Sequence, residues 1–136
     1  MQFKFINLGQ TVMRYETPLD MFNAINNIYD NNFTILHKAN KQLVGKIVNE
    51  HSIFYDGTDQ YKMKNHNLLP RNVSDWFLSV FKHYLDFNFI KQYKTHLNSI
   101  WINEMKANEY NPVHIHQGTL YTGLSSVMIL KLPSTF

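Results

Sequence analysis

Apolar residues recur at helical spacing in two stretches of the chain, residues 19–29 and 73–87. This spacing is typical of an amphipathic helix, which packs one face against a core. Thr17-Pro18 has the form of an N-cap followed by proline at the first helical position, and Asp30-Asn31-Asn32 ends the first stretch. Asn72 and Asp75 resemble a capping box before the second stretch. We therefore predict two helices with core-facing positions Leu19, Phe22, Ile25, Tyr29, Trp76, Phe77, Val80, Phe81, Tyr84 and Leu85.

Runs rich in apolar residues, several of them alternating with polar ones, predict strands elsewhere. A short strand is expected over 3–8, ended by Gly9, and one or two irregular strands over 43–55, closed by Asp56-Gly57. Later, strands are expected over 97–104, 110–116 and 124–132, with a turn through Ala107-Asn108-Glu109 after the first of them. The expected order along the chain is therefore helices first and most of the sheet afterwards.

These elements predict one α+β domain over residues 1–136. The composition agrees with a folded core, because 44% of the residues are hydrophobic and 15% are aromatic. The chain has no cysteine, which excludes disulfides, thiolate metal sites and cysteine nucleophiles. Any metal would have to bind histidine, carboxylate or carbonyl groups.

The charge pattern is weakly basic, with a formal net charge of +3. The densest basic stretch, residues 82–94, is interrupted by aromatic and aliphatic residues, so we interpret it as the solvated face of a helix and expect no nucleic-acid partner. A nucleic-acid-binding accessory protein is therefore the weakest of the functional hypotheses for this chain. No apolar run reaches the roughly 18 residues of a membrane span, and residues 1–8 lack the features of a signal peptide. We therefore expect a cytoplasmic protein without a membrane partner.

The segment that suggests chemistry is residues 111–118, which contain His114 and His116. Residues i and i+2 of a strand point to the same face, so the two imidazoles could bind one metal ion at about 2.1 Å each. Equally, one histidine could face the core with its hydrogen bonds satisfied while the other simply titrates. The remaining histidines are interpreted as surface or structural residues, and they are His37, His51, His66, His83 and His96.

An ordered set of motifs surrounds this pair. Trp101-x-Asn103 precedes Asn111-Pro112-x-His114-x-His116, and Leu124-Ser125-Ser126-Val127, Ile129-Leu130 and Pro133 follow. This set resembles the 2-oxoglutarate- and Fe(II)-dependent oxygenases of bacteriophages, which are relatives of the prolyl 4-hydroxylases. The resemblance covers residues 97–133, under a third of the chain.

The resemblance implies a partial double-stranded β-helix, a cupin or jelly-roll-like sheet, over residues 97–136, flanked by a helix-rich part over 1–96. It implies Fe(II) bound by His114 and by His116, which replaces the family's usual carboxylate, with positions left for 2-oxoglutarate and O₂. It further implies Lys131 as an anchor for the cosubstrate's far carboxylate and Tyr121 at the mouth of the site. A solvated lysine at a strand end is the alternative interpretation of Lys131. In a phage-encoded protein the location would be the host cytoplasm.

Two departures from the family pattern leave the function open. A complete β-helix needs roughly 80–90 residues, but residues 97–136 are far fewer, and no histidine follows His116 to act as the distal ligand. We therefore expect a C-terminally truncated oxygenase, active only when a further segment or subunit completes the site. The alternative is a non-catalytic phage structural or interaction protein that oligomerises, or binds another phage protein, through a sheet edge after Leu132. Neither hypothesis identifies a small-molecule, protein or nucleotide substrate.

Overall fold

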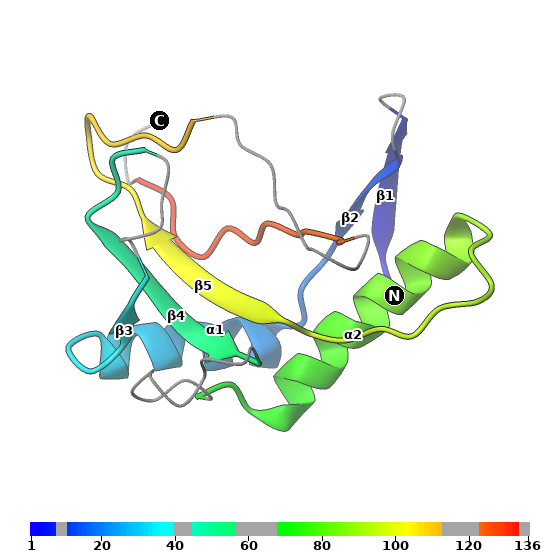
Figure 1. Ribbon diagram of the computed structural model, residues 1–136, viewed down its shortest axis with the longest axis horizontal. Helices are drawn as coiled ribbons and strands as arrows, with labels where there is room; N and C mark the ends of the chain where they lie inside the picture. The colour runs from blue at the N-terminus through cyan, green and yellow to red at the C-terminus, as the bar shows by residue number, and fades with distance from the viewer. Residues whose placement is uncertain (8–10, 40–44, 57–67, 113–122, 134–136) are drawn as a thin grey trace.

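The computed structural model describes residues 1–7, 11–39, 45–56, 68–112 and 123–133. These residues form an α+β fold with two helices and two small antiparallel sheets, and neither sheet closes into a barrel (Figure 1). The elements are β1 (Phe3–Asn7), β2 (Thr11–Tyr15), α1 (Leu19–Asn32), β3 (His37–Lys38), β4 (Asn49–Tyr55), α2 (Arg71–Phe87) and β5 (Ser99–Glu104). The predicted α+β class is confirmed.

The larger sheet has the strand order β3-β4-β5, with both pairs antiparallel. In the β4–β5 pair Asn49 lies opposite Glu104 and Tyr55 opposite Ser99, and an irregularity in register falls between Ser52 and Phe54. The second sheet is a hairpin of β1 and β2. Both helices lie on one side of the three-stranded sheet, and the hairpin stands beside α2 (Figure 1).

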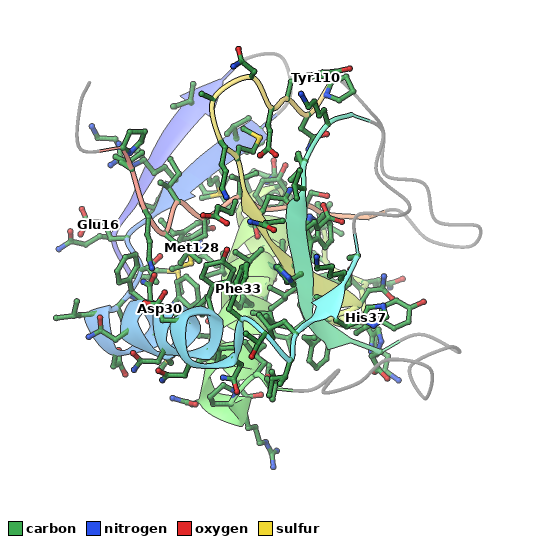
Figure 2. The ribbon with its side chains drawn as sticks, turned by 90° about the vertical axis from the view of Figure 1, so that its left-hand side faces the viewer. Glu16, Asp30, Phe33, His37, Tyr110 and Met128 are labelled. Carbon is green, nitrogen blue, oxygen red and sulfur yellow. The ribbon has the colours of Figure 1, made fainter. Side chains whose placement is uncertain are left out.

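The hydrophobic core lies between the two helices and the three-stranded sheet. Ile53 of β4 and Val73 of α2 are completely buried, and each contributes branched aliphatic surface to the same cluster. The segment 123–133 also packs there through Met128 and Leu130, and Met128 lies beside α1 (Figure 2). The buried members of the cluster are Ile25, Ile28, Leu36, Ile53, Val73, Phe77 and Ile102.

Both helices are where the periodicity predicts them, but their first residues differ from the prediction. The N-cap of α1 is Pro18 instead of Thr17, and the N-cap of α2 is Pro70, with no side-chain capping bond at either N-terminus. The predicted capping box at Asn72 and Asp75 is wrong, because Asn72 already lies inside the helix and directs its amide nitrogen toward Met21 Sδ, 3.8 Å away. Proline suits both positions because it has no backbone N–H that would need a partner.

The predicted order of helices first and sheet afterwards is wrong. Strands precede both helices, and β3 and β4 lie between them in sequence. The predicted strand over 124–132 is also wrong: residues 123–133 are irregular, and Val127 is 94% exposed. Side chains of alternate residues in this segment reach the core. This produces the same alternation of apolar positions as a strand, although the backbone is not paired in a sheet among the described residues.

The hairpin, whose second strand the sequence did not predict, is attached to α2 by side-chain contacts. Tyr15 Oη lies 2.8 Å from His83 Nδ1, and the Tyr84 hydroxyl donates to the Thr11 carbonyl at 2.8 Å. Thr11 Oγ1 donates to Asn88 Oδ1 at 2.6 Å, just beyond the helix. Burial and the nearby Tyr84 raise the pKa of Tyr15, so its phenol stays protonated at neutral pH.

In the part of the chain that the structure describes, neither helix is both long and apolar enough to span a membrane.

Candidate functional site

The segment that leads to the predicted metal ligands starts in β5 and reverses direction. The predicted turn is confirmed: Asn108 has φ 65°, and Glu109 N donates to Lys106 O at 3.0 Å. The returning chain is fixed at Tyr110, which forms an antiparallel bridge with Lys46 through two backbone hydrogen bonds of 3.0 Å. His114, His116 and Tyr121 follow within residues 113–122 and lie outside the described residues.

Gly45 allows the returning segment to approach this closely. Its φ of +136° is rarely adopted by residues with a side chain, and a Cβ there would lie 2.6 Å from both Pro112 Cδ and the Tyr110 carbonyl oxygen. The residues immediately before the histidine pair are therefore packed against position 45. The sequence shows a glycine in an apolar run, which is a recognised sign of close backbone approach.

The Trp101-x-Asn103 motif lies on the sheet face opposite the helices. Ile102 between them is buried in the core, so the alternation of strand side chains directs Trp101 and Asn103 to the other face. On the adjacent β4, Ser52 lies opposite Trp101 and Glu50 opposite Asn103. Asn103 Oδ1 is buried and accepts no hydrogen bond among the described residues. This face is therefore polar, in contrast to the apolar face that meets the helices.

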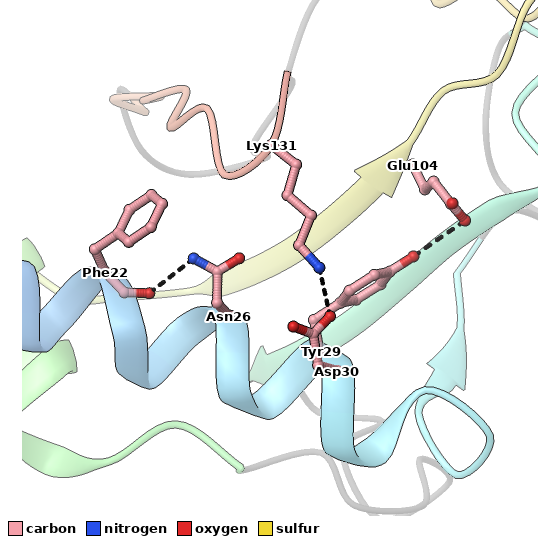
Figure 3. Close-up of polar contacts among 6 residues, drawn as sticks. All are labelled: Phe22, Asn26, Tyr29, Asp30, Glu104 and Lys131. Carbon is pink, nitrogen blue, oxygen red and sulfur yellow. Dashed lines mark hydrogen bonds and ion pairs between the residues drawn. The ribbon is translucent and has the colours of Figure 1, made fainter. Parts of the chain in front are cut away.

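A polar cluster on the helical side joins α1 to the sheet. The Tyr29 hydroxyl donates to Glu104 Oε2 at 3.2 Å (Figure 3). Asn49 Nδ2 donates to the same oxygen at 2.5 Å. Burial, together with the charge and hydrogen bond of Glu104, raises the pKa of Tyr29 to about 12. The phenol is therefore a neutral hydrogen-bond donor near pH 7, and the cluster is suited to holding the helix in place.

Lys131, the predicted anion anchor, contacts α1. Its Nζ lies 2.5 Å from Asp30 Oδ1 and 5.8 Å from the centre of the Tyr29 ring (Figure 3). The two charged side chains are each about half exposed. Lys131 and Asp30 are 101 residues apart in sequence, so this ion pair attaches segment 123–133 to a distant helix.

His51 is the most buried titratable side chain of the described residues, with 1% of its surface exposed. Its ring packs against those of Tyr29 and Phe33, with centroids 6.2 Å and 4.8 Å away, and its Nδ1 has no hydrogen-bond partner among the described residues. Burial is the main reason that its pKa is lowered, and the positive charge of Lys38 adds to the effect. The prediction that this histidine is structural agrees with its place in the core.

No group of three histidine, aspartate or glutamate side chains able to hold a metal ion occurs within the described ranges. His114 and His116 lie outside those ranges, so the predicted pair stays a prediction. Two imidazoles suit Fe(II) by donor type, but they do not form a facial triad alone.

Comparisons with protein-family models, with curated proteins and with solved structures found no match to this chain.

Proposed function

We propose that this protein is a metal-binding relative of the 2-oxoglutarate- and Fe(II)-dependent oxygenases, with His114 and His116 as its metal ligands. One observation carries the proposal most directly. The first half of the resembling motif, from Trp101 to Pro112, comprises most of β5, a tight turn and a return segment bridged at Lys46. Antiparallel reversals of this kind are the units from which a double-stranded β-helix is built.

The polar sheet face gives this proposal a second support. Trp101 and Asn103 lie on the face opposite the helices, beside the buried polar residues Ser52 and Glu50, as expected if that face meets a polar ligand. Bound Fe(II) and 2-oxoglutarate would supply oxidising chemistry at such a site. The chain's own part would be to present the imidazoles of His114 and His116, which follow the contact of Tyr110 and Pro112 with Gly45 in sequence, and the site would need a third ligand.

Anaerobic Fe(II) titration by calorimetry tests the proposal. We expect one Fe(II) per chain, with an affinity at least about 100-fold weaker in the double variant His114→Ala/His116→Ala, because both imidazole donors are lost. His96→Ala is the matched control, since His96 is an exposed histidine that pairs with Asp56 at 3.2 Å. Equal and negligible uptake by the native protein and the double variant would rule out the metal site.

A second candidate function is favoured by the surface of the sheet region. In the described part of the chain β5 is an edge strand, and the neighbouring segment 123–133 exposes Val127, Ile129 and Leu132. Exposed apolar side chains next to a sheet are suited to contact with another chain. We therefore propose, as the alternative, a non-catalytic interaction protein that oligomerises through the sheet region that carries these side chains.

Sedimentation velocity distinguishes this alternative. An oligomer is expected whose dissociation constant rises at least tenfold in Val127→Lys, because a charge would be buried at the interface. Leu19→Lys is the control, since Leu19 is equally an exposed aliphatic residue but lies on α1. A protein that stays monomeric over a wide concentration range would contradict the alternative.

A further inference from the structure

The basic stretch at residues 82–94 is not the single helical face expected from its sequence. α2 ends at Phe87, and the chain then reverses and runs back beside the helix toward β5 (Figure 1). We call residues 88–94 the post-helix segment. Tyr93 attaches this segment to α2, because its hydroxyl donates to Asp86 Oδ1 at 2.5 Å and lies 3.5 Å from the Lys82 carbonyl oxygen. The end of the helix and the post-helix segment therefore form one continuous surface.

The reversal holds Phe89 in a backbone conformation that a residue with a side chain disfavours. Ile90 N donates to Leu85 O at 3.0 Å and Phe89 N donates to Asp86 O at 3.1 Å, which is the hydrogen-bond pattern of a Schellman motif. Phe89 has the left-handed position of that motif, with φ 59°, where glycine is preferred. Burial does not compensate, because the ring is 84% exposed. Since disfavoured conformations cluster at functional sites, the exposed ring is a candidate for binding.

Lysines supply most of the charge of this surface. Residues 82–94 contain Lys82, Lys91 and Lys94 but a single acidic residue, Asp86. All three lysines are exposed, and none of them forms an ion pair with a carboxylate of the described residues. The Asp86 carboxylate, in contrast, accepts the hydrogen bond from Tyr93. The surface therefore carries a net positive charge next to an exposed aromatic ring.

We propose that the end of α2 and the post-helix segment form a binding surface for single-stranded nucleic acid. The Phe89 ring would stack on a base, and the three lysines would contact the phosphates. Proteins that bind single strands without sequence preference combine exposed aromatic rings with cationic side chains in this way. Stacking needs a base whose face is free, so a duplex would not use the ring. The surface includes no residue of the proposed metal site, and its function is independent of metal.

The isolation of the Phe89 ring favours nucleic acid over a protein partner. An aromatic anchor in a protein interface lies within a ring of further contacts that exclude water. Among residues 82–94, however, the other exposed apolar side chains are only Phe87 and Ile90, which are 39% and 43% exposed. Lysines occupy the positions where such an apolar ring would continue, and they suit phosphates. A second copy of this chain is a poor fit, because a symmetric contact would bring the same cations together.

Fluorescence anisotropy with labelled oligo(dT) and oligo(U) tests the Phe89 ring. The key variant is Phe89→Asn, because asparagine tolerates the left-handed conformation, so its melting temperature should not fall and lost binding would not come from unfolding. Phe89→Trp keeps an aromatic ring at the same position. Leu19→Ala is the matched control, since it removes an exposed apolar side chain on α1. Affinity is expected to fall at least tenfold in Phe89→Asn, to persist in Phe89→Trp and to stay unchanged in Leu19→Ala.

The salt dependence of the same binding tests the lysines. Each phosphate contact with a single strand contributes about 0.7 to the slope of log affinity against log salt concentration. The double variant Lys91→Ala/Lys94→Ala is therefore expected to reduce this slope by about 1.4. Lys106→Ala, at an exposed lysine in the turn after β5, should leave the slope unchanged.

Two further probes compare the alternatives, a DNA duplex and an acidic peptide containing leucine and phenylalanine. We expect both to bind more weakly than the single strands, and a preference between oligo(dT) and oligo(U) would identify DNA or RNA as the ligand. No binding of either oligonucleotide, or equal affinity in Phe89→Asn and the native protein, would overturn the proposal. Tighter binding of the duplex would exclude base stacking, and tighter binding of the peptide would replace nucleic acid by a protein partner.

Discussion

Replacing Ile53 by alanine is expected to lower the free energy of unfolding by about 3–4 kcal/mol. Ile53 is fully buried in β4, where it meets residues of both helices in the core cluster. The substitution removes three carbon atoms and leaves a cavity that the rigid sheet cannot fill by moving. For a domain of this size the loss is a large fraction of the total stability, so partial unfolding at ambient temperature is expected.

Urea denaturation of the native protein and the variant, followed by circular dichroism, measures this loss. Ile129→Ala is the matched control, because it makes the same substitution at a side chain that is 65% exposed in segment 123–133. That variant is expected to lose less than about 1 kcal/mol. If both substitutions cost the same, the core does not lie where the two helices meet β4.

Acidification below pH 6.5 is expected to destabilise the protein through His51. Burial lowers the pKa of this imidazole in the folded protein, whereas in the unfolded chain it has its ordinary value near 6.5. The unfolded chain therefore takes up a proton first as the pH falls. The stability that the neutral ring provides is complete above pH 6.5 and is lost progressively below it, at up to about 1.4 kcal/mol per pH unit.

The groups around His51 explain why protonation is not compensated. Lys38, from the neighbouring strand β3, opposes a positive charge, while Glu104 of β5 favours one but already accepts bonds from Tyr29 and Asn49. The rings of Tyr29 and Phe33 pack against the imidazole. The Tyr29 hydroxyl is bonded to Glu104, and His51 Nδ1 has no hydrogen-bond partner among the described residues, so none of these contacts replaces water around an imidazolium.

Comparing denaturation midpoints at pH 7.5 and pH 5 in the native protein and in His51→Gln isolates this contribution. The glutamine variant is expected to be less stable at pH 7.5 but to lose less stability on acidification, because its side chain does not titrate. His37→Gln, on the short strand β3, should keep the full pH dependence. An identical loss in the native protein and His51→Gln would show that other groups cause it.

The sequence correctly predicted those helices and turns that are determined mainly by their own residues. α2 has apolar positions on one face over several turns, and that face is the one buried, with Val73, Phe77 and Val80 at its centre. The turn at Asn108 likewise follows from a residue that tolerates positive φ. The segment 124–132 failed as a strand because its apolar side chains pack without a hydrogen-bonded neighbour among the described residues, and alternation alone does not reveal a partner.

The candidate site depended more on contacts between distant segments. Lys131 meets Asp30 across most of the chain, and His51 is buried only because α1 is laid over β4. Nothing near either residue in sequence indicates these partners. Gly45 could be recognised as a point of close approach, but the approaching residues Tyr110 and Pro112 could not. Proposals for His114 and His116 therefore still depend on motif resemblance.

The pairing of β4 with β5 also constrains how the protein folds. Asn49 and Glu104 are directly opposed although they are 55 residues apart, and all of α2 lies between them. Closing so long a loop is entropically costly before any strand contact is gained, whereas the turns of α2 can form locally within microseconds. The helix would thus shorten the search, because it brings the chain back toward β4 before the central strand finds its second neighbour.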